Sequence, residues 1–190
     1  MEQIALMADN FGETDLLAEC RNGSREAFET LYKLHQKRVY SVALNYFGGN
    51  QDKANDITQQ VFLKLFTRFS DFRGEAEFTT WIYRITVNSC IDEQRKSSRF
   101  FGLADFFGLT DTKMKPEEYV QQKQISAEVQ IVIANLKPKF RVPIVLKYVE
   151  GLSYEEIAKV LDCSIGTVSS RMNRGHKLLA QKLAHLKNEI

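Results

Sequence analysis

The sequence has few cysteines and no long apolar run. Its three cysteines, Cys20, Cys90 and Cys163, are odd in number and widely spaced, which argues against a disulfide framework and against a CxxC metal site. No apolar segment approaches the ~20 residues that span a bilayer, and the N-terminus lacks the basic-then-apolar pattern of a signal peptide. We therefore expect a cytoplasmic protein whose thiols are reduced and partly buried.

Signals for strands and for catalysis are also scarce. Few segments alternate with a period of two, and only three prolines interrupt the helical spacing. The three histidines are His35, His176 and His185, and the chain contains no HExxH, GxSxG or P-loop pattern. These absences predict an all-α protein that is not an enzyme, with no catalytic residues, no metal, no cofactor and no small-molecule substrate.

Charge is distributed unevenly along the chain. Residues 1–19 carry five carboxylates and no Lys or Arg. Residues 164–190 carry five basic side chains and one acidic one, Glu189. A basic end of this kind suggests contact with a polyanion, although a solvated helix face gives the same pattern.

The spacing of apolar residues divides the chain into two small helical domains. Residues 52–69 form a strongly amphipathic pattern, with apolar positions at Ile57, Val61, Phe62, Leu65, Phe66 and Phe69. A loop at 71–77 precedes a helix expected at about 79–96. We predict an acidic leader at 1–14, a first domain at 15–96, a flexible linker at 97–117 and a second domain at 118–190.

The linker is unusually aromatic. Phe100, Phe101, Phe106 and Phe107 would expose a large apolar patch if the linker were free in solution. Either the segment folds back between the two domains or a partner covers it. We favour the first arrangement, in which the free protein is compact and the facing surfaces of its two domains are partly masked against each other.

The clearest motif is a helix-turn-helix at residues 151–171. Ser153 and Glu156 have the S-x-x-E spacing of a capping box, Asp162-Cys163 supplies a turn, and Ser164 is an N-cap candidate for the second helix. In DNA-binding proteins the second helix of such a pair enters the major groove. The alternative is a helical hairpin in an all-α core with a solvated basic face.

The second helix of the motif has distinct inner and outer faces. At 100° per residue, Met172, Gly175 and Leu179 fall within about 40° of Val168 and should pack inward. The predicted DNA-binding residues of the second domain, which the resemblance described below assigns to the −35 element, are Ser164, Thr167, Ser169, Ser170, Arg171, Asn173, Arg174 and Lys177.

The second informative stretch is FRGEAEFTTWIYRITVN, residues 72–88. Trp81, Arg84, Asn88 and Arg95 share one face of the expected helix, and such groups stack on open bases, bind phosphates and bond base edges. Taken alone, however, this stretch favours Trp81 and Phe78 as core residues.

Together, these motifs and the upstream DITQQVFLKLF resemble the extracytoplasmic-function sigma factors of the sigma-70 family. The resemblance covers about residues 14–186, with the motifs in the family's order and approximate spacing. It implies region 2 and region 4 domains that take RNA polymerase to −10 and −35 promoter elements and promote DNA melting.

The resemblance also implies partners and residue roles. Core RNA polymerase would bind through the clamp helices of its largest subunit and its flap region, and an anti-sigma factor would control the protein. The implied polymerase-binding residues are Asp52, Asp56, Gln59, Gln60 and Lys64. The implied −10 residues are Phe72, Arg73, Phe78, Trp81, Arg84, Asn88 and Arg95.

This chain departs from the family at the second helix of the motif. Gly175 replaces a usual Ala and should cost the helix roughly 0.5–1 kcal/mol. The alternative function is a helix-turn-helix regulator that binds duplex DNA but not polymerase. The FRGEAEFTTW loop argues against it, because a duplex reader needs no loop that captures a base.

Overall fold

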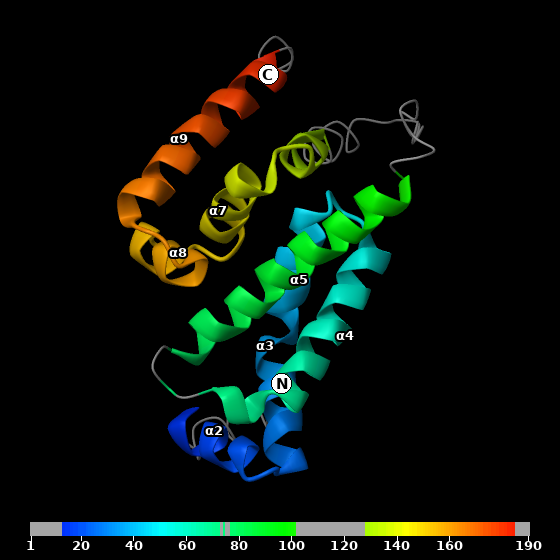
Figure 1. The fold of residues 1–190 in the computed structure, drawn as a ribbon, viewed down its shortest axis with the longest axis vertical. Coiled ribbons are helices and arrows are strands. Elements are labelled where there is room, and N and C mark those ends of the chain that lie inside the picture. The colour runs from blue at the N-terminus through cyan, green and yellow to red at the C-terminus, as the bar shows by residue number, and fades with distance from the viewer. Residues whose placement is uncertain (1–12, 73, 75–76, 102–127, 185–190) are drawn as a thin grey trace, which may run out of the picture.

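The structure, a computed structural model, describes residues 13–72, 74, 77–101 and 128–184. All regular elements in these ranges are helices, as the sequence predicted. They form two groups, α2–α5 and α7–α9, which lie side by side (Figure 1).

The first group contains four α-helices and one 3₁₀ turn. Their bounds are α2 Glu13–Arg21, α3 Arg25–Tyr46, α4 Gln51–Thr67, η1 Phe69–Asp71 and α5 Phe78–Phe101. Side-chain caps start two of them: the Ser24 hydroxyl accepts from the Ala27 N–H, and the Asn50 carboxamide oxygen accepts from the Lys53 N–H. Between α3 and α4, Gly48 and Gly49 both have positive φ, which lets the chain reverse there.

The helix at α5 is longer than the sequence predicted. It continues to Phe101, five residues beyond the expected end at Lys96. The physical reason is that residues 97–101 contain neither Gly nor Pro, so nothing in them stops a helix. The first five residues of the predicted linker are therefore helical. Residues 102–117, which include Phe106 and Phe107, lie outside the described part of the chain.

The second group contains the helix-turn-helix. After a helical stretch at 128–134, it comprises α7 Pro138–Val149, α8 Tyr154–Leu161 and α9 Ile165–Lys182. The capping box is present: the Ser153 hydroxyl accepts from the Glu156 N–H, and the Glu156 carboxylate accepts from the Ser153 N–H. Asp162 ends α8 in the left-handed conformation, with φ 49°, and Ser164 caps α9.

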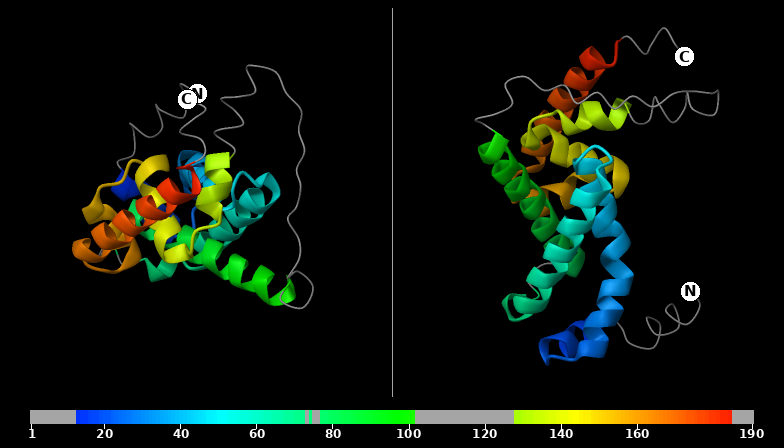
Figure 2. Two further views of the ribbon diagram at one scale, coloured as in Figure 1. Left: turned by 90° about the horizontal axis from the view of Figure 1, so that it is seen from above. Right: turned by 90° about the vertical axis from the view of Figure 1, so that its right-hand side faces the viewer.

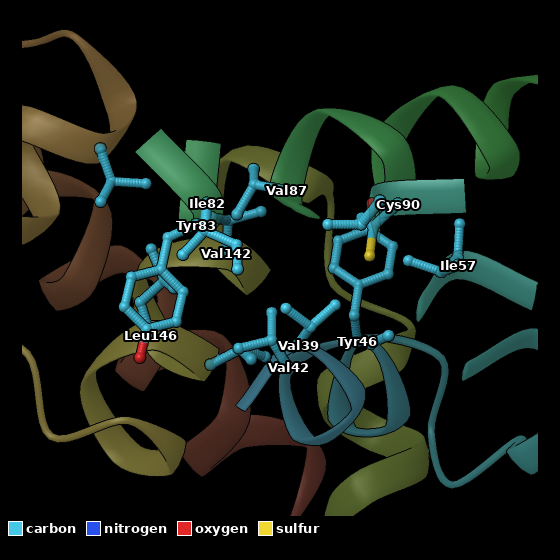
Figure 3. Packing of buried hydrophobic residues seen from close by; sticks show 14 of the residues in the cluster. Val39, Val42, Tyr46, Ile57, Ile82, Tyr83, Val87, Cys90, Val142 and Leu146 are labelled. Atoms are coloured by element: carbon cyan, nitrogen blue, oxygen red, sulfur yellow. The ribbon is translucent and has the colours of Figure 1, made fainter. Parts of the chain in front are cut away.

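The two groups share one hydrophobic core. Val39, Val42 and Tyr46 from α3 meet Val142 and Leu146 from α7 (Figure 3). Helix α5 packs against α3 and α4 and also against α8. Figure 2 shows the same association of the two groups from two further directions. The two groups are therefore closely associated among the described helices, whereas the predicted fold-back of the aromatic linker concerns residues that lie largely outside the described part of the chain.

Candidate nucleic-acid and protein interfaces

Helix α9 presents the polar face that the sequence predicted. Val168, Met172 and Gly175 are buried against the rest of the second group. On the opposite side Asn173 and Arg174 are exposed. With Ser170 and Lys177, they line a shallow groove along the helix. The inward and outward assignments for α9 are therefore correct.

Four other predicted −35 residues have additional roles or less exposure. The Ser164 hydroxyl caps α9 and lies 2.9 Å from the Thr167 hydroxyl. Ser169 and Arg171 are half-buried. Arg171 lines the groove between the two helix groups and also a second hollow, which it shares with Ser170 and Arg174.

Gly175 lies where α7 packs closely against α9. A Cβ at this position would lie 2.6 Å from Ile144 Cδ1 and 3.5 Å from the Phe140 carbonyl oxygen. The expectation that glycine only costs the helix stability is therefore incomplete, because the absent side chain lets α7 approach α9.

Helix α5 carries the predicted −10 face. Arg84, Asn88 and Arg95 are exposed, and Trp81 is half-buried. Asn88 and Arg95 line a groove of about 750 Å³ between α5 and the second group, and Arg84 contributes to the same groove. Arg84, Asn88 and Arg95 therefore share one side of the helix, as predicted, whereas the Trp81 ring packs against Phe69, Phe72 and Phe78 and does not line this groove.

The two phenylalanines of this set lie in a core cluster. Phe72 and Phe78 are 7% and 3% exposed, and their rings contact each other, Phe69 and Trp81. Neither ring is accessible to a base in this structure, as the core interpretation of Phe78 anticipated. Arg73 lies outside the described residues.

Helix α4 carries the predicted polymerase-binding face. Asp52, Asp56 and Gln59 are exposed, and Gln60 is half-buried. Lys64 is turned toward α5, where its ammonium donates a 2.9 Å hydrogen bond to the Ser89 hydroxyl. The Lys64 side chain is therefore directed toward α5 and does not extend along the face of the exposed carboxylates.

Sequence reasoning assigned one apolar residue of α4, Phe66, to the wrong face and did not identify an exposed one, Leu63. Phe66 was assigned to the buried face, but it is 58% exposed, because its ring lies at the end of α4 and contacts Phe28 edge-on. Leu63 is 65% exposed. At 100° per residue Leu63 falls on the stripe of Asp52, Asp56 and Gln59, and an apolar residue on that polar stripe was the signal that could have found it.

Side chains of four described residues, Tyr83, Arg84, Gln130 and Arg141, make polar contacts that join the two helix groups. The Tyr83 hydroxyl donates a 2.6 Å hydrogen bond to Glu150. The Arg84 guanidinium donates to the carbonyl oxygens of Lys159 and Val160 near the end of α8, at 2.7 and 3.4 Å. The Gln130 carboxamide donates a 3.4 Å hydrogen bond to Asn45 Oδ1, and Arg141 of α7 makes the remaining contacts.

Arg141 is deeply buried, with the same 4% exposure as Tyr83. Its guanidinium donates to the carbonyl oxygens of Leu136 and Tyr46 and to the Gln94 side chain, and it stacks 4.4 Å from the centre of the Tyr46 ring. Burial lowers the pKa of Arg141 and raises the pKa of Tyr46 to about 12. Sequence reasoning missed Arg141, because nothing local distinguishes it from a surface arginine.

The contact between Tyr83 and Glu150 is also partly removed from water. Burial, together with the hydrogen bond to Glu150, raises the pKa of Tyr83. Burial raises the pKa of Glu150 too, against the opposing effects of the Tyr83 hydrogen bond and of nearby Arg38. Tyr83 therefore stays protonated and acts as the donor.

The thiols behave as the sequence predicted. Cys20 and Cys90 are buried, Cys163 is half-buried, and all three are free. Burial raises the pKa of Cys20 to about 11 and that of Cys90 to about 12, so both remain neutral thiols. Within the described ranges, no helix is long and apolar enough to cross a membrane. The same residues contain no group of three or more His, Cys, Asp or Glu side chains that could hold a metal ion.

Two family models match the chain. Sigma-70 region 2 matches residues 31–100, and Sigma-70, region 4 matches residues 126–179. The first match contains α4 and all of α5 except its last residue, and the second contains the helix-turn-helix.

Curated relatives and solved structures agree with these matches. The chain is 30% identical to the ECF RNA polymerase sigma-E factor of Haemophilus influenzae over 190 residues, covering 95% of this chain and 100% of that protein. It is 29% identical to the ECF RNA polymerase sigma factor SigW of Bacillus subtilis, covering 90% of this chain and 96% of that protein. Among solved structures, CnrH in complex with the cytosolic domain of CnrY has a similar fold, with a TM-score of 0.67 at 24% identity, covering 90% of this chain and 96% of that one. The chain thus belongs to the extracytoplasmic-function sigma factors of the sigma-70 family.

Proposed function

We propose that this protein is the sigma subunit of a bacterial RNA polymerase and acts in the cytoplasm as a non-enzymatic initiation factor. The observation that carries the proposal is the pairing of a capped helix-turn-helix with a second polar face on α5, Arg84, Asn88 and Arg95. A duplex-binding regulator needs only the first of these surfaces, whereas a sigma factor uses both.

Helix α9 reads the −35 element in this proposal. Arg174 is exposed in mid-helix, where a guanidinium can bond guanine O6 and N7 together. Asn173 lies beside it, and Lys177 lies one turn further along, where it contacts phosphate. Ser164 and Thr167 sit at the start of the helix and fix its first turn.

Helix α5 and the loop before it open and read the −10 element. Trp81 is half-buried and partly open to a stacked base. Phe72 and Phe78 have an indirect role: their ring contacts with Trp81 hold the indole ring in place. Asn88 offers a carboxamide to base edges, and Arg84 and Arg95 offer guanidinium groups to phosphates.

The exposed face of α4 binds the clamp helices of the largest polymerase subunit. The carboxylates of Asp52 and Asp56 share the exposed stripe of α4 with an apolar residue, Leu63, which lies two turns beyond Asp56. Charged and exposed apolar side chains on one face suit a protein interface. Lys64 contributes indirectly, through its bond to Ser89.

An anti-sigma factor and the polymerase flap complete the set of proposed partners. A Bartonella quintana sigma factor of similar fold, RpoE, was solved with the anti-sigma factor NepR, with a TM-score of 0.64 at 24% identity. The proposal of an anti-sigma partner rests on family membership and on the exposed apolar residues of α4.

Two measurements test the proposed function. The purified chain should co-elute with core polymerase, and the resulting holoenzyme should initiate transcription on a subset of a promoter library. A chain that binds duplex DNA tightly by itself but neither co-elutes nor supports transcription would be the helix-turn-helix regulator instead.

A further inference from the structure

A basic hollow lies between the start of α7 and one side of α9. Its volume is about 790 Å³. Half of the side chains that line it are cationic: Lys137, Lys139, Arg171, Arg174 and Lys182. None of the described residues that line it is acidic. The hollow is therefore a concentrated positive surface.

This positive charge is not neutralised within the described part of the chain. Lys137, Lys139 and Lys182 are exposed, and none of the five cationic side chains pairs with a described carboxylate. Lys137 and Lys139 lie on either side of Pro138, where α7 begins, and the first turn of α7 contains no acidic residue. The helix dipole is positive there, so two lysines are unfavourable for the helix itself. Like charges gathered in this way oppose folding and attract an anionic partner.

The hollow is continuous with the groove along the outer face of α9. Ser170, Arg174 and Leu178 line both of them. Arg174, the proposed contact to guanine, therefore stands at the border between the groove and the hollow. A duplex bound on α9 would be the nearest polyanion to the hollow.

The dimensions of the helix agree with a duplex in this place. At 1.5 Å per residue, Lys182 lies about 12 Å beyond Arg174 along the axis of α9. This distance is about the width of the major groove. If Arg174 contacts a base edge, Lys182 reaches the backbone that borders the groove. Lys137 and Lys139 line the same hollow as Lys182, from the start of the neighbouring helix.

We propose that this basic hollow is a second DNA-binding surface, which holds the phosphate backbone beside the −35 element without reading its sequence. Lys137, Lys139 and Lys182 are its phosphate ligands. Duplex DNA is the partner, rather than an acidic protein segment, because the hollow opens into the groove that contains Arg174. The inference rests on the proposed −35 role of α9.

The test uses holoenzyme assembled from core polymerase and the full-length chain. Fluorescence anisotropy measures its binding to a labelled promoter duplex from the selected library at several salt concentrations. The variants are Lys182→Gln and the double variant Lys137→Gln/Lys139→Gln, which remove charge from exposed side chains. Lys147→Gln is the matched control, because Lys147 lies in the last turn of α7, outside the hollow.

Each lost phosphate contact should lower the slope of log affinity against log salt by about 0.9. For the double variant, the advantage of the wild type should therefore be about tenfold greater at about 50 mM salt than at about 200 mM. Preference among −35 sequences should not change, because phosphate contacts carry no base information. Lys147→Gln should match the wild type.

A chemical change in the DNA locates the contact. Uncharged methylphosphonate linkages are placed one at a time in the backbone beside the −35 element. At least one linkage should weaken the wild type several-fold and leave the double variant Lys137→Gln/Lys139→Gln unaffected, since that variant has already lost the contact.

Three results would overturn the proposal. The first is an unchanged salt slope in both lysine variants while circular dichroism shows them folded. The second is an equal change of slope in Lys147→Gln, which would indicate long-range charge and not a contact in the hollow. The third is weaker binding of core polymerase with normal DNA binding, which would make the hollow a docking site for an acidic protein segment.

Arg174→Ala tests the underlying −35 assignment separately. Unchanged base preference in this variant would refute the reading role of α9. The salt slopes of the lysine variants and the methylphosphonate scan would still decide whether the hollow binds DNA.

Discussion

Replacing Gly175 by Ala should destabilise the protein, although alanine is the better helix former. The added Cβ would lie 2.6 Å from Ile144 Cδ1. Ile144 is 1% exposed, so any shift of its terminal methyl has to be accommodated within the core. Overpacking of this kind costs about 1–3 kcal/mol, and the gain in helix propensity returns about 1 kcal/mol. We expect a net loss of about 1 kcal/mol.

A second substitution tests the cause. Ile144→Val deletes the clashing methyl and by itself costs about 0.5–1.5 kcal/mol. In the double variant the new Ala methyl takes the place of the missing one, and the remaining contacts of the added Cβ are 3.5 Å, an ordinary distance. The double variant should therefore be about as stable as the wild type, with a coupling energy of about 2 kcal/mol in favour of the pair.

The assay is urea unfolding followed by far-UV circular dichroism. Gly166→Ala is the matched control, because Gly166 is exposed on the same helix and an added Cβ would meet only the Ser164 hydroxyl, at 3.9 Å. It should be neutral or stabilising. If Gly175→Ala alone stabilised the protein, or if the two single effects simply added, packing against Ile144 would not be the reason for the glycine.

Four further predictions concern the proposed surfaces and one buried group. Asp56→Arg should weaken core-polymerase binding in a competition assay without changing the circular dichroism, because it reverses a charge on the exposed face of α4. Asn88→Ala should reduce open-complex formation, measured by permanganate footprinting, with little effect on core binding. Arg174→Ala should relax preference at one base position by ~1–3 kcal/mol, whereas Lys177→Ala should weaken all sequences about equally and flatten the salt dependence. The free energy of unfolding, measured by urea titration, should fall as the pH drops below about 6.5 toward 4. His35→Phe should make this free energy depend less on pH.

The sign of the His35 effect follows from its surroundings. Burial, and secondarily the positive charge of Arg38, lower its pKa to about 4 in the folded protein. Between this value and the ordinary pKa of about 6.5 only the unfolded chain takes up the proton, so acid favours unfolding. An unchanged slope in His35→Phe would contradict this assignment. Unaltered polymerase competition by Asp56→Arg would contradict the assignment of α4, and unaltered permanganate footprints of Asn88→Ala would contradict that of α5. For α9, the contradicting result is that Arg174→Ala and Lys177→Ala have indistinguishable profiles across a randomised −35 library.

The helix ends and helix faces were predictable from the sequence because they depend on residues within one or two turns. The capping box at Ser153 and Glu156 and the N-cap at Ser164 were each visible in a few consecutive letters. The outward position of Arg174 follows from its angle to Val168 alone. The sequence alone therefore determined that the protein is all-α, carries a helix-turn-helix and has a second polar face on α5.

Only the tertiary structure decided what depends on a distant partner. The Arg141 guanidinium reaches Tyr46, 95 positions earlier in the chain, so no local pattern marks it as buried. Phe66 has the spacing of a core residue but lies at the end of α4 with one aromatic neighbour, so most of its ring is exposed. By helix propensity alone Gly175 is unfavourable in α9, and only its contact with α7 gives a reason for the glycine. In each case the deciding quantity is the distance to another helix, which helical periodicity does not contain.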